Sequence, residues 1–329
     1  MPAGAVARTI AAAWLALACA MIGSGQIPAA TLQQANTYLQ AGQADKALAI
    51  LTPLPTSGTG AATAQNLLCR VRYTLADWSN AEKACTLAVQ LDGQNSDEHM
   101  WLGRVLGQEA NHASVFSAYG IAKRSLAEME TAAKLGPQNG PALSDLGDYY
   151  AQAPGIAGGG ADKAQAIATQ LDKVDATRAA QLRGDIAMAQ KDDTTAEQQY
   201  RKAIASASSA AEYWTVLANL FRERKRWSDF DSAIQSCVAA AAKDKNPGVA
   251  LYDGAGQLLA AKRNPSVAEQ MLQNYLSSSS ITEEGPAFIA HIRLSRLKKQ
   301  LGDAAGANAE LATASNMAHE FSPSQDVIK

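Results

Sequence analysis

Aromatic residues make up only 6% of this chain of 329 residues, and neither sign of charge dominates, because the formal net charge is -2 at pH 7. The chain therefore lacks the strongly basic face that nucleic-acid binding needs. Its four cysteines and four histidines are dispersed and show none of the ligand spacings of a zinc site. The metalloprotease, nucleophile-elbow and dinucleotide-binding patterns are also missing. We expect no nucleic-acid partner, no metal or other cofactor, and no enzyme activity.

Long apolar runs are absent beyond the N-terminus. Residues 10–22 are uncharged and apolar and follow Arg8, but the run is too short for an ordinary membrane-spanning helix. We expect residues 1–25 to be a signal peptide, with cleavage contexts at residues 18–20 and 28–30. Alternatively, Leu17-Ala18-Cys19 is a lipoprotein box and Cys19 is lipidated, or the leader stays as an anchor. The predicted location is periplasmic or secreted, with a membrane-anchored lipoprotein as the alternative.

Alanine is abundant, and alanine is the best helix former and lets helices pack closely. A small residue recurs at intervals of 32 to 44 positions, and further residues follow it by four and by seven, which is the spacing of one helix face. The recurring positions are Ala47, Ala81, Ser125, Ala164, Ala196, Phe230, Ala268 and Ala307. The two longest early intervals are explained by insertions, at residues 107–120 and in the Gly-rich stretch after Tyr150.

The recurring unit resembles the tetratricopeptide repeat. The sixth unit carries Trp214, Leu217, Ala218 and Phe221, and the fourth carries Leu146, Gly147 and Tyr150. The resemblance implies an all-α superhelical solenoid of about eight helical hairpins over residues 30–320. The units are expected near 31–56, 62–93, 97–137, 140–174, 177–208, 211–243, 248–279 and 286–320.

The same resemblance implies a protein-binding groove lined by the first helix of each unit, and hence a non-catalytic, extracytoplasmic scaffold or adaptor for a polypeptide partner. The alternative is an envelope-associated structural or assembly protein that acts through its convex face or its inserted loops. In the groove we expect a basic N-terminal end, an acidic middle and a return to positive charge. The predicted groove residues are Asn66, Arg70, Tyr73, Arg104, Asp148, Asp185, Asn219, Arg222 and Arg296.

Three smaller features complete the predictions. Cys69 and Cys85 fall at facing positions of the second unit, so they are either disulfide-bonded or two buried thiols. The Gly-rich insertion is expected to widen a turn, although anion binding before a helix is the alternative. Its marked residues are Pro154, Gly155, Gly158, Gly159 and Gly160. The acidic pair Glu283-Glu284 falls in a predicted turn, where solvation is the expected reason for it.

Overall fold

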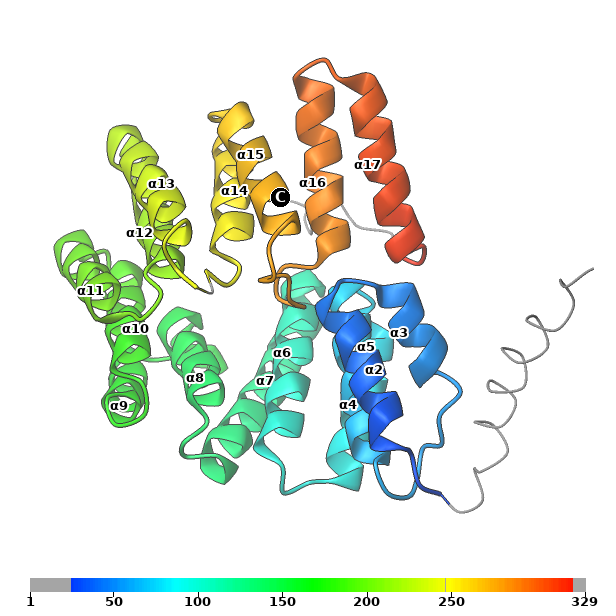
Figure 1. Cartoon of the computed structure of the whole chain (residues 1–329). Helices are drawn as coiled ribbons and strands as arrows, with labels where there is room; N and C mark the ends of the chain where they lie inside the picture. Colours follow the sequence, from blue (N-terminus) through cyan, green and yellow to red (C-terminus); the bar gives the residue numbers. More distant parts are fainter. Residues whose placement is uncertain (1–24, 246, 322–329) are drawn as a thin grey trace, which may run out of the picture.

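The computed structural model describes residues 25–245 and 247–321, and within them helices are the regular elements (Figure 1). They form eight helical hairpins, which confirms the predicted all-α solenoid. The first helices are α2 (Ala29–Gln40), α4 (Ala61–Thr74), α6 (Ser96–His112), α8 (Gly140–Gln152), α10 (Ala176–Ala189), α12 (Ala211–Glu223), α14 (Ala250–Ala261) and α16 (Ala287–Gln300). The second helices are α3 (Ala44–Leu51), α5 (Trp78–Leu91), α7 (Val115–Leu135), α9 (Ala161–Leu171), α11 (Asp193–Ser206), α13 (Trp227–Ala241), α15 (Pro265–Leu276) and α17 (Ala304–Met317).

The recurring small residues are the contact points inside each hairpin. Seven of the eight are fully buried, and Ala307 is 4% exposed. Small residues on the first helices serve the same contact: α10 carries Gly184, where an added Cβ would lie 2.3 Å from the ring of Tyr200 in α11. A larger side chain on one helix therefore fits against a minimal one on the other, and this complementarity holds each pair together.

The tight turns inside six of the hairpins share one backbone conformation. In six units a residue with positive φ follows the first helix: Gly42, Ala76, Lys191, Lys225, Lys262 and Gly302. In each case the next N–H donates to the carbonyl five residues back, as Asp77 does to Arg72, which is the Schellman ending of a helix. Asp77, Asp192 and Asp303 then cap the following helix.

The third and fourth units replace this turn. In the third, the insertion lengthens both helices, so α6 runs to His112 and α7 starts at Val115. In the fourth, the Gly-rich insertion forms a loop with a short 3-10 helix, η1 (Gly155–Ala157), before α9. The insertions thus leave the hairpin stacking intact and change only the turns.

The last described unit leaves an apolar side chain uncovered. Leu311 lies four residues after Ala307, and the equivalent residue is buried in every preceding unit, yet Leu311 is 52% exposed. The described residues include no ninth unit to cover it, so α17 presents an open apolar face. Repeat arrays bury such faces only by stacking neighbours.

The superhelix turns far enough for its two ends to meet (Figure 1). Arg70 in α4 forms a bidentate ion pair with Glu283, in the linker between α15 and α16, and Gln40 also donates to Glu283 at 3.1 Å. Two more contacts lie along the same junction between the two ends, which we call the seam. Arg72 pairs with Glu320, and the His319 side chain lies 2.8 Å from Asp45. The seam closes the array into a ring around a central chamber.

Candidate functional site in the central chamber

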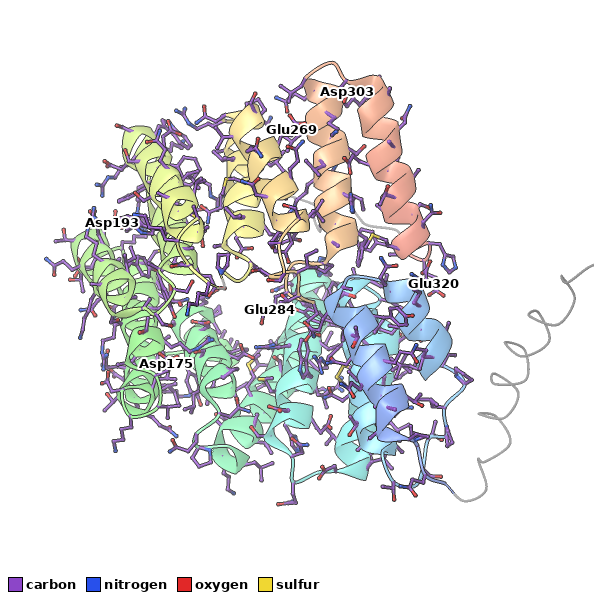
Figure 2. All side chains as sticks on the ribbon, viewed as in Figure 1. Asp175, Asp193, Glu269, Glu284, Asp303 and Glu320 are labelled. Atoms are coloured by element: carbon purple, nitrogen blue, oxygen red, sulfur yellow. A yellow bond between two sulfur atoms is a disulfide. The ribbon has the colours of Figure 1, made fainter. Side chains whose placement is uncertain are left out.

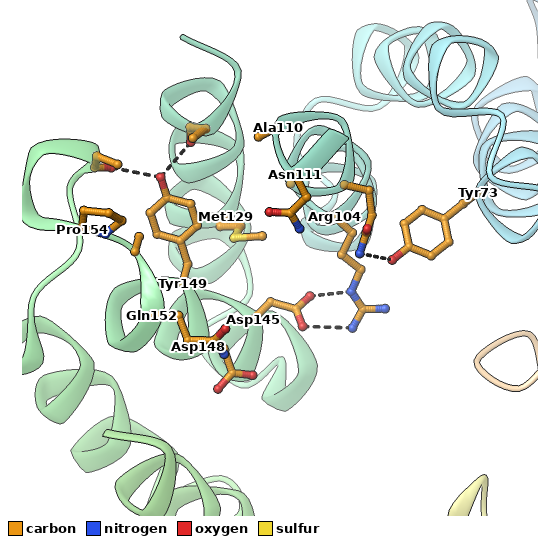
Figure 3. Close-up of a pocket in the computed structure, with 15 residues that line it drawn as sticks. Tyr73, Arg104, Ala110, Asn111, Met129, Asp145, Asp148, Tyr149, Gln152 and Pro154 are labelled. Carbon is orange, nitrogen blue, oxygen red and sulfur yellow. Dashed lines mark hydrogen bonds and ion pairs between the residues drawn. The ribbon is translucent and has the colours of Figure 1, made fainter. Parts of the chain in front are cut away.

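The chamber consists of three adjoining hollows of about 520, 500 and 600 Å³. The first and second share Tyr73 and Arg104, and the first and third share Asp148 and Gln152. Seven first helices, α4 to α16, supply residues to the walls, and the α15–α16 linker closes one side. Figure 3 shows the first hollow, with Arg104, Asp145, Asp148 and Tyr149 around it.

One end of the chamber is aromatic. Tyr73 contacts Trp78 and Trp101 edge-on, with ring centroids 5.3 and 5.6 Å apart. The guanidinium groups of Arg70 and Arg104 lie 5.3 and 4.7 Å from the Trp101 centroid. Such cation–π contacts fix the two arginines against the ring.

The predicted basic character of this end is wrong. Arg104 donates through Nε to Asp145 at 2.5 Å and through a second nitrogen at 3.2 Å (Figure 3). Arg70 is neutralised by Glu283, whose side chain is only 10% exposed rather than solvated in a turn. Both acids come from other units, which is why the positive charges looked free in the sequence. Asn66 is also no groove residue, because it is buried and donates to Glu98 at 2.6 Å.

The other end of the chamber is acidic. Asp148 on α8, Asp185 on α10 and Asp253 on α14 line the third hollow. Burial raises the pKa of Asp185 to about 6 and that of Asp253 to about 7. Burial also raises the pKa of Asp148 well above its usual range, and the nearby negative charge of Asp185 raises it further. Negative charge in this part of the chamber is poorly compensated.

Polar side chains complete the acidic end. Asn219 and Arg222 line the third hollow together, and Asn219 accepts a hydrogen bond from Arg222 at 2.7 Å. Gln257 donates through Nε2 to the Thr215 carbonyl at 2.8 Å, while its Oε1 is buried without a partner among the described residues. An acceptor buried in this way is costly unless something donates to it.

The structure separates Arg296 from the other predicted groove residues. Arg296 lies in a different hollow between α16 and α17, at the open end of the array, with Leu311. Arg293, one turn earlier on α16, lines the chamber instead and lies over the Tyr252 ring at 4.0 Å. The repeat pattern is degenerate in the last two units, so the register there could not be read correctly, and Asp253 and Arg293 were missed for this reason.

The Gly-rich loop forms part of the wall. Pro154 and Ala157 line the first hollow. The Tyr149 hydroxyl lies 2.9 Å from the Ala157 carbonyl oxygen and 3.0 Å from that of Ala122, so it joins the loop to α7 (Figure 3). Lys163 donates to the Gly158 carbonyl at 2.8 Å. Two of its glycines are required by the local geometry. A Cβ on Gly159 would lie 1.8 Å from the Ala153 carbonyl oxygen, and Gly158 has a φ of +97°, which residues with a side chain rarely adopt. Gly155 and Gly160, by contrast, have open space beside them.

Apolar side chains project from the two insertions. At the start of α7, Val115 is 86% and Phe116 98% exposed, and in η1 Ile156 is 79% exposed. These are the most exposed large apolar side chains of the described residues. They lie outside the chamber walls.

The cysteines of the second unit are joined. Cys69 in α4 and Cys85 in α5 form a disulfide with their Cα atoms 5.2 Å apart, and both are fully buried. Cys237 is a buried free thiol, and burial raises its pKa to about 12. Because only the thiolate is nucleophilic, this cysteine is inert at neutral pH.

Across residues 25–245 and 247–321, no group of three or more His, Cys, Asp and Glu side chains is arranged to hold a metal ion. In the same part of the chain, no helix has the length and apolar character needed to cross a bilayer. The leader predicted for residues 1–25, including Cys19, lies almost wholly outside the described residues.

No protein-family model matches the sequence, and no curated protein is significantly similar to it. Among solved structures, a thermophilic TPR protein of Thermus thermophilus is similar with 18% identity and a TM-score of 0.48, over 58% of this chain and 97% of that one. A tetratricopeptide repeat protein of Parabacteroides merdae has 12% identity and a TM-score of 0.46, over 79% and 97%. PilF of Pseudomonas aeruginosa has 12% identity and a TM-score of 0.40, over 79% and 94%. At these values we transfer no function from the three proteins.

Proposed function

We propose that this protein is an extracytoplasmic scaffold or adaptor that binds a polypeptide partner in its central chamber and catalyses no reaction. The observation that carries the proposal is the shared use of the first helices: seven of them turn polar or aromatic side chains into one continuous hollow space. Helical repeat arrays bind extended partners on such concave surfaces.

The size and lining of the chamber favour a polypeptide over a small molecule. Each hollow alone has the volume of a small-molecule pocket. The three together offer aromatic rings, paired arginines and carboxylates in succession, from Tyr73 to Asp253. A chain of several residues can use this succession, whereas one compact ligand would fill only a part of it.

The extracytoplasmic location rests on two supports. The first is the leader-like composition of residues 1–25. The second is the Cys69–Cys85 disulfide, since disulfides persist in oxidising compartments such as the periplasm. Mass spectrometry of the mature N-terminus from native cells tests it: cleavage or a lipidated Cys19 supports export, and an intact Met1 in the cytoplasmic fraction contradicts it.

Site-specific photo-crosslinking in the native cells tests the chamber itself. A photoreactive residue at Gln152, which is exposed and lines two of the hollows, should crosslink to a polypeptide. The matched control is Gln165 on α9 of the same unit, which is also exposed and lines none of the three hollows. Equal crosslinking from both positions, or crosslinking from Gln165 alone, would contradict the proposal.

A second candidate is envelope attachment through the inserted turns. The exposed Val115, Phe116 and Ile156 favour it, because large apolar side chains left in solvent on inserted turns are available to contact a partner or a membrane surface. Sedimentation with vesicles of anionic phospholipid tests this candidate. Loss of sedimentation on Phe116→Ser together with Ile156→Ser would support it, and no sedimentation of the wild type would exclude it.

A further inference from the structure

The walls of the chamber carry more acidic than basic side chains. Six carboxylates line the three hollows: Asp145, Asp148, Asp185, Asp253, Glu283 and Glu284. Against them stand three guanidinium groups, those of Arg104, Arg222 and Arg293, and no lysine among the lining residues. Arg70 adds a fourth guanidinium group behind Glu283, so carboxyl groups outnumber guanidinium groups by two.

The excess falls at defined positions. Asp145 and Glu283 are engaged in bidentate pairs with Arg104 and Arg70. For Asp148 and Glu284, in contrast, the described residues provide no ion pair and no side-chain hydrogen bond. Glu284 projects into the central opening of the ring (Figure 2). The carboxyl groups that have no basic partner among the described residues therefore lie in the chamber itself, where a polypeptide partner would lie.

Asp185 and Asp253 strengthen this distribution. The Asp185 carboxylate accepts a hydrogen bond from the Tyr200 hydroxyl at 2.7 Å and has no ion pair among the described residues. Asp253 lies in the same hollow, on the α14 side. Asp148 and Asp185, from α8 and α10, are close enough for the charge of Asp185 to act on Asp148, so a cation between these two could contact both.

We infer that the partner is a basic polypeptide segment, which places a lysine or arginine side chain between Asp148 and Asp185 and packs other residues against Tyr73 and Trp101. The inference rests on the proposed polypeptide-binding function and adds the chemistry of the partner. Complementary charge also excludes acidic segments, because like charges brought together in a partly desolvated site are repelled.

Selection from a displayed library of random dodecapeptides tests the inference on the full-length protein. Wild type is expected to enrich lysine and arginine several-fold over the starting library and to deplete aspartate and glutamate. The double variant Asp148→Asn/Asp185→Asn should lose this enrichment and bind the selected peptides at least tenfold more weakly. The control Asp92→Asn/Asp162→Asn makes the same two substitutions at exposed positions and should behave as wild type.

The outcomes separate the two proposals. Peptides selected without basic enrichment, or with an enrichment that the chamber double variant retains, would overturn the basic-partner inference while leaving polypeptide binding in place. Failure to select any peptide, together with no crosslink from Gln152, would overturn the proposed function and the inference with it.

Discussion

Arg70 and Glu283 lie 213 residues apart in the sequence and form a two-pronged ion pair across the seam of the ring. Their side chains are only 19% and 10% exposed. Arg70→Ala should cost about 1–3 kcal/mol of stability, because it leaves the partly buried Glu283 carboxylate without its charged partner and with Gln40 as its remaining side-chain donor. It should also raise the radius of gyration measured by small-angle X-ray scattering, since the ends separate. Arg183→Ala is the control: Arg183 makes a similar pair with Asp172 inside the array, so its loss should leave the radius unchanged.

Two glycines at equivalent turn positions offer a second test of the seam. Gly42 and Gly302 both have positive φ, of 67° and 89°, so alanine at either position should cost about 1–2 kcal/mol. A Cβ on Gly42 would lie 2.5 Å from the Ala287 backbone nitrogen, whereas one on Gly302 meets open space. Gly42→Ala should therefore be more destabilising in urea unfolding and should expand the particle. Equal costs and equal radii for the two variants would contradict the seam.

Removal of the disulfide should destabilise the N-terminal units. The bond joins residues 16 apart in the sequence, for which the chain-entropy account gives about 3 kcal/mol. Cys69→Ala/Cys85→Ala should show this loss in urea unfolding. Dithiothreitol should shift the wild type in the same direction and leave the double variant unmoved. If dithiothreitol still lowered the stability of the double variant, its effect would not come from the Cys69–Cys85 disulfide. Cys237→Ala is the control for the free thiol.

The acidic end of the chamber predicts an unusual pH dependence. Because the pKa of Asp148 is raised on folding, the folded state keeps a proton that the unfolded state loses above about pH 4. Its contribution to stability therefore falls as pH rises from about 4 through the raised folded pKa. Asp148→Asn should be more stable than wild type at pH 8, because its amide needs no proton to be neutral, and the difference should shrink toward pH 4. Asp162→Asn, at an exposed position, should show no such trend.

The hairpins could be predicted because their signal is local. Each small residue and its partners lie within one or two turns of helix, and burial of residues such as Ala81 and Ala196 confirms that reading. Phe230 shows the tolerance of the pattern, since a ring fills the same slot and is fully buried. Each hairpin forms these contacts with segments that are adjacent to it in the sequence.

The chamber could be predicted only in part, for two physical reasons. Its charge balance depends on pairs such as Arg104–Asp145 and Arg70–Glu283, which the curvature of the superhelix brings together and no periodicity encodes. Which residues of the last units face the chamber depends on the rotation of their helices, and the repeat pattern is degenerate there. Arg293 therefore lines the chamber where Arg296 was expected. Asp148 and Asp185 were found because their units keep the pattern.

The closed seam also sets how a partner can get in. While α2, α3 and α4 contact the α15–α16 linker and the segment from α17 onward, a segment with a free end can thread through the ring, but an internal loop of a folded protein must wait for the seam to part. Chain ends and internal loops of the same composition should therefore associate at different rates. High salt, which weakens ion pairs at the seam, should narrow that difference by speeding the entry of loops.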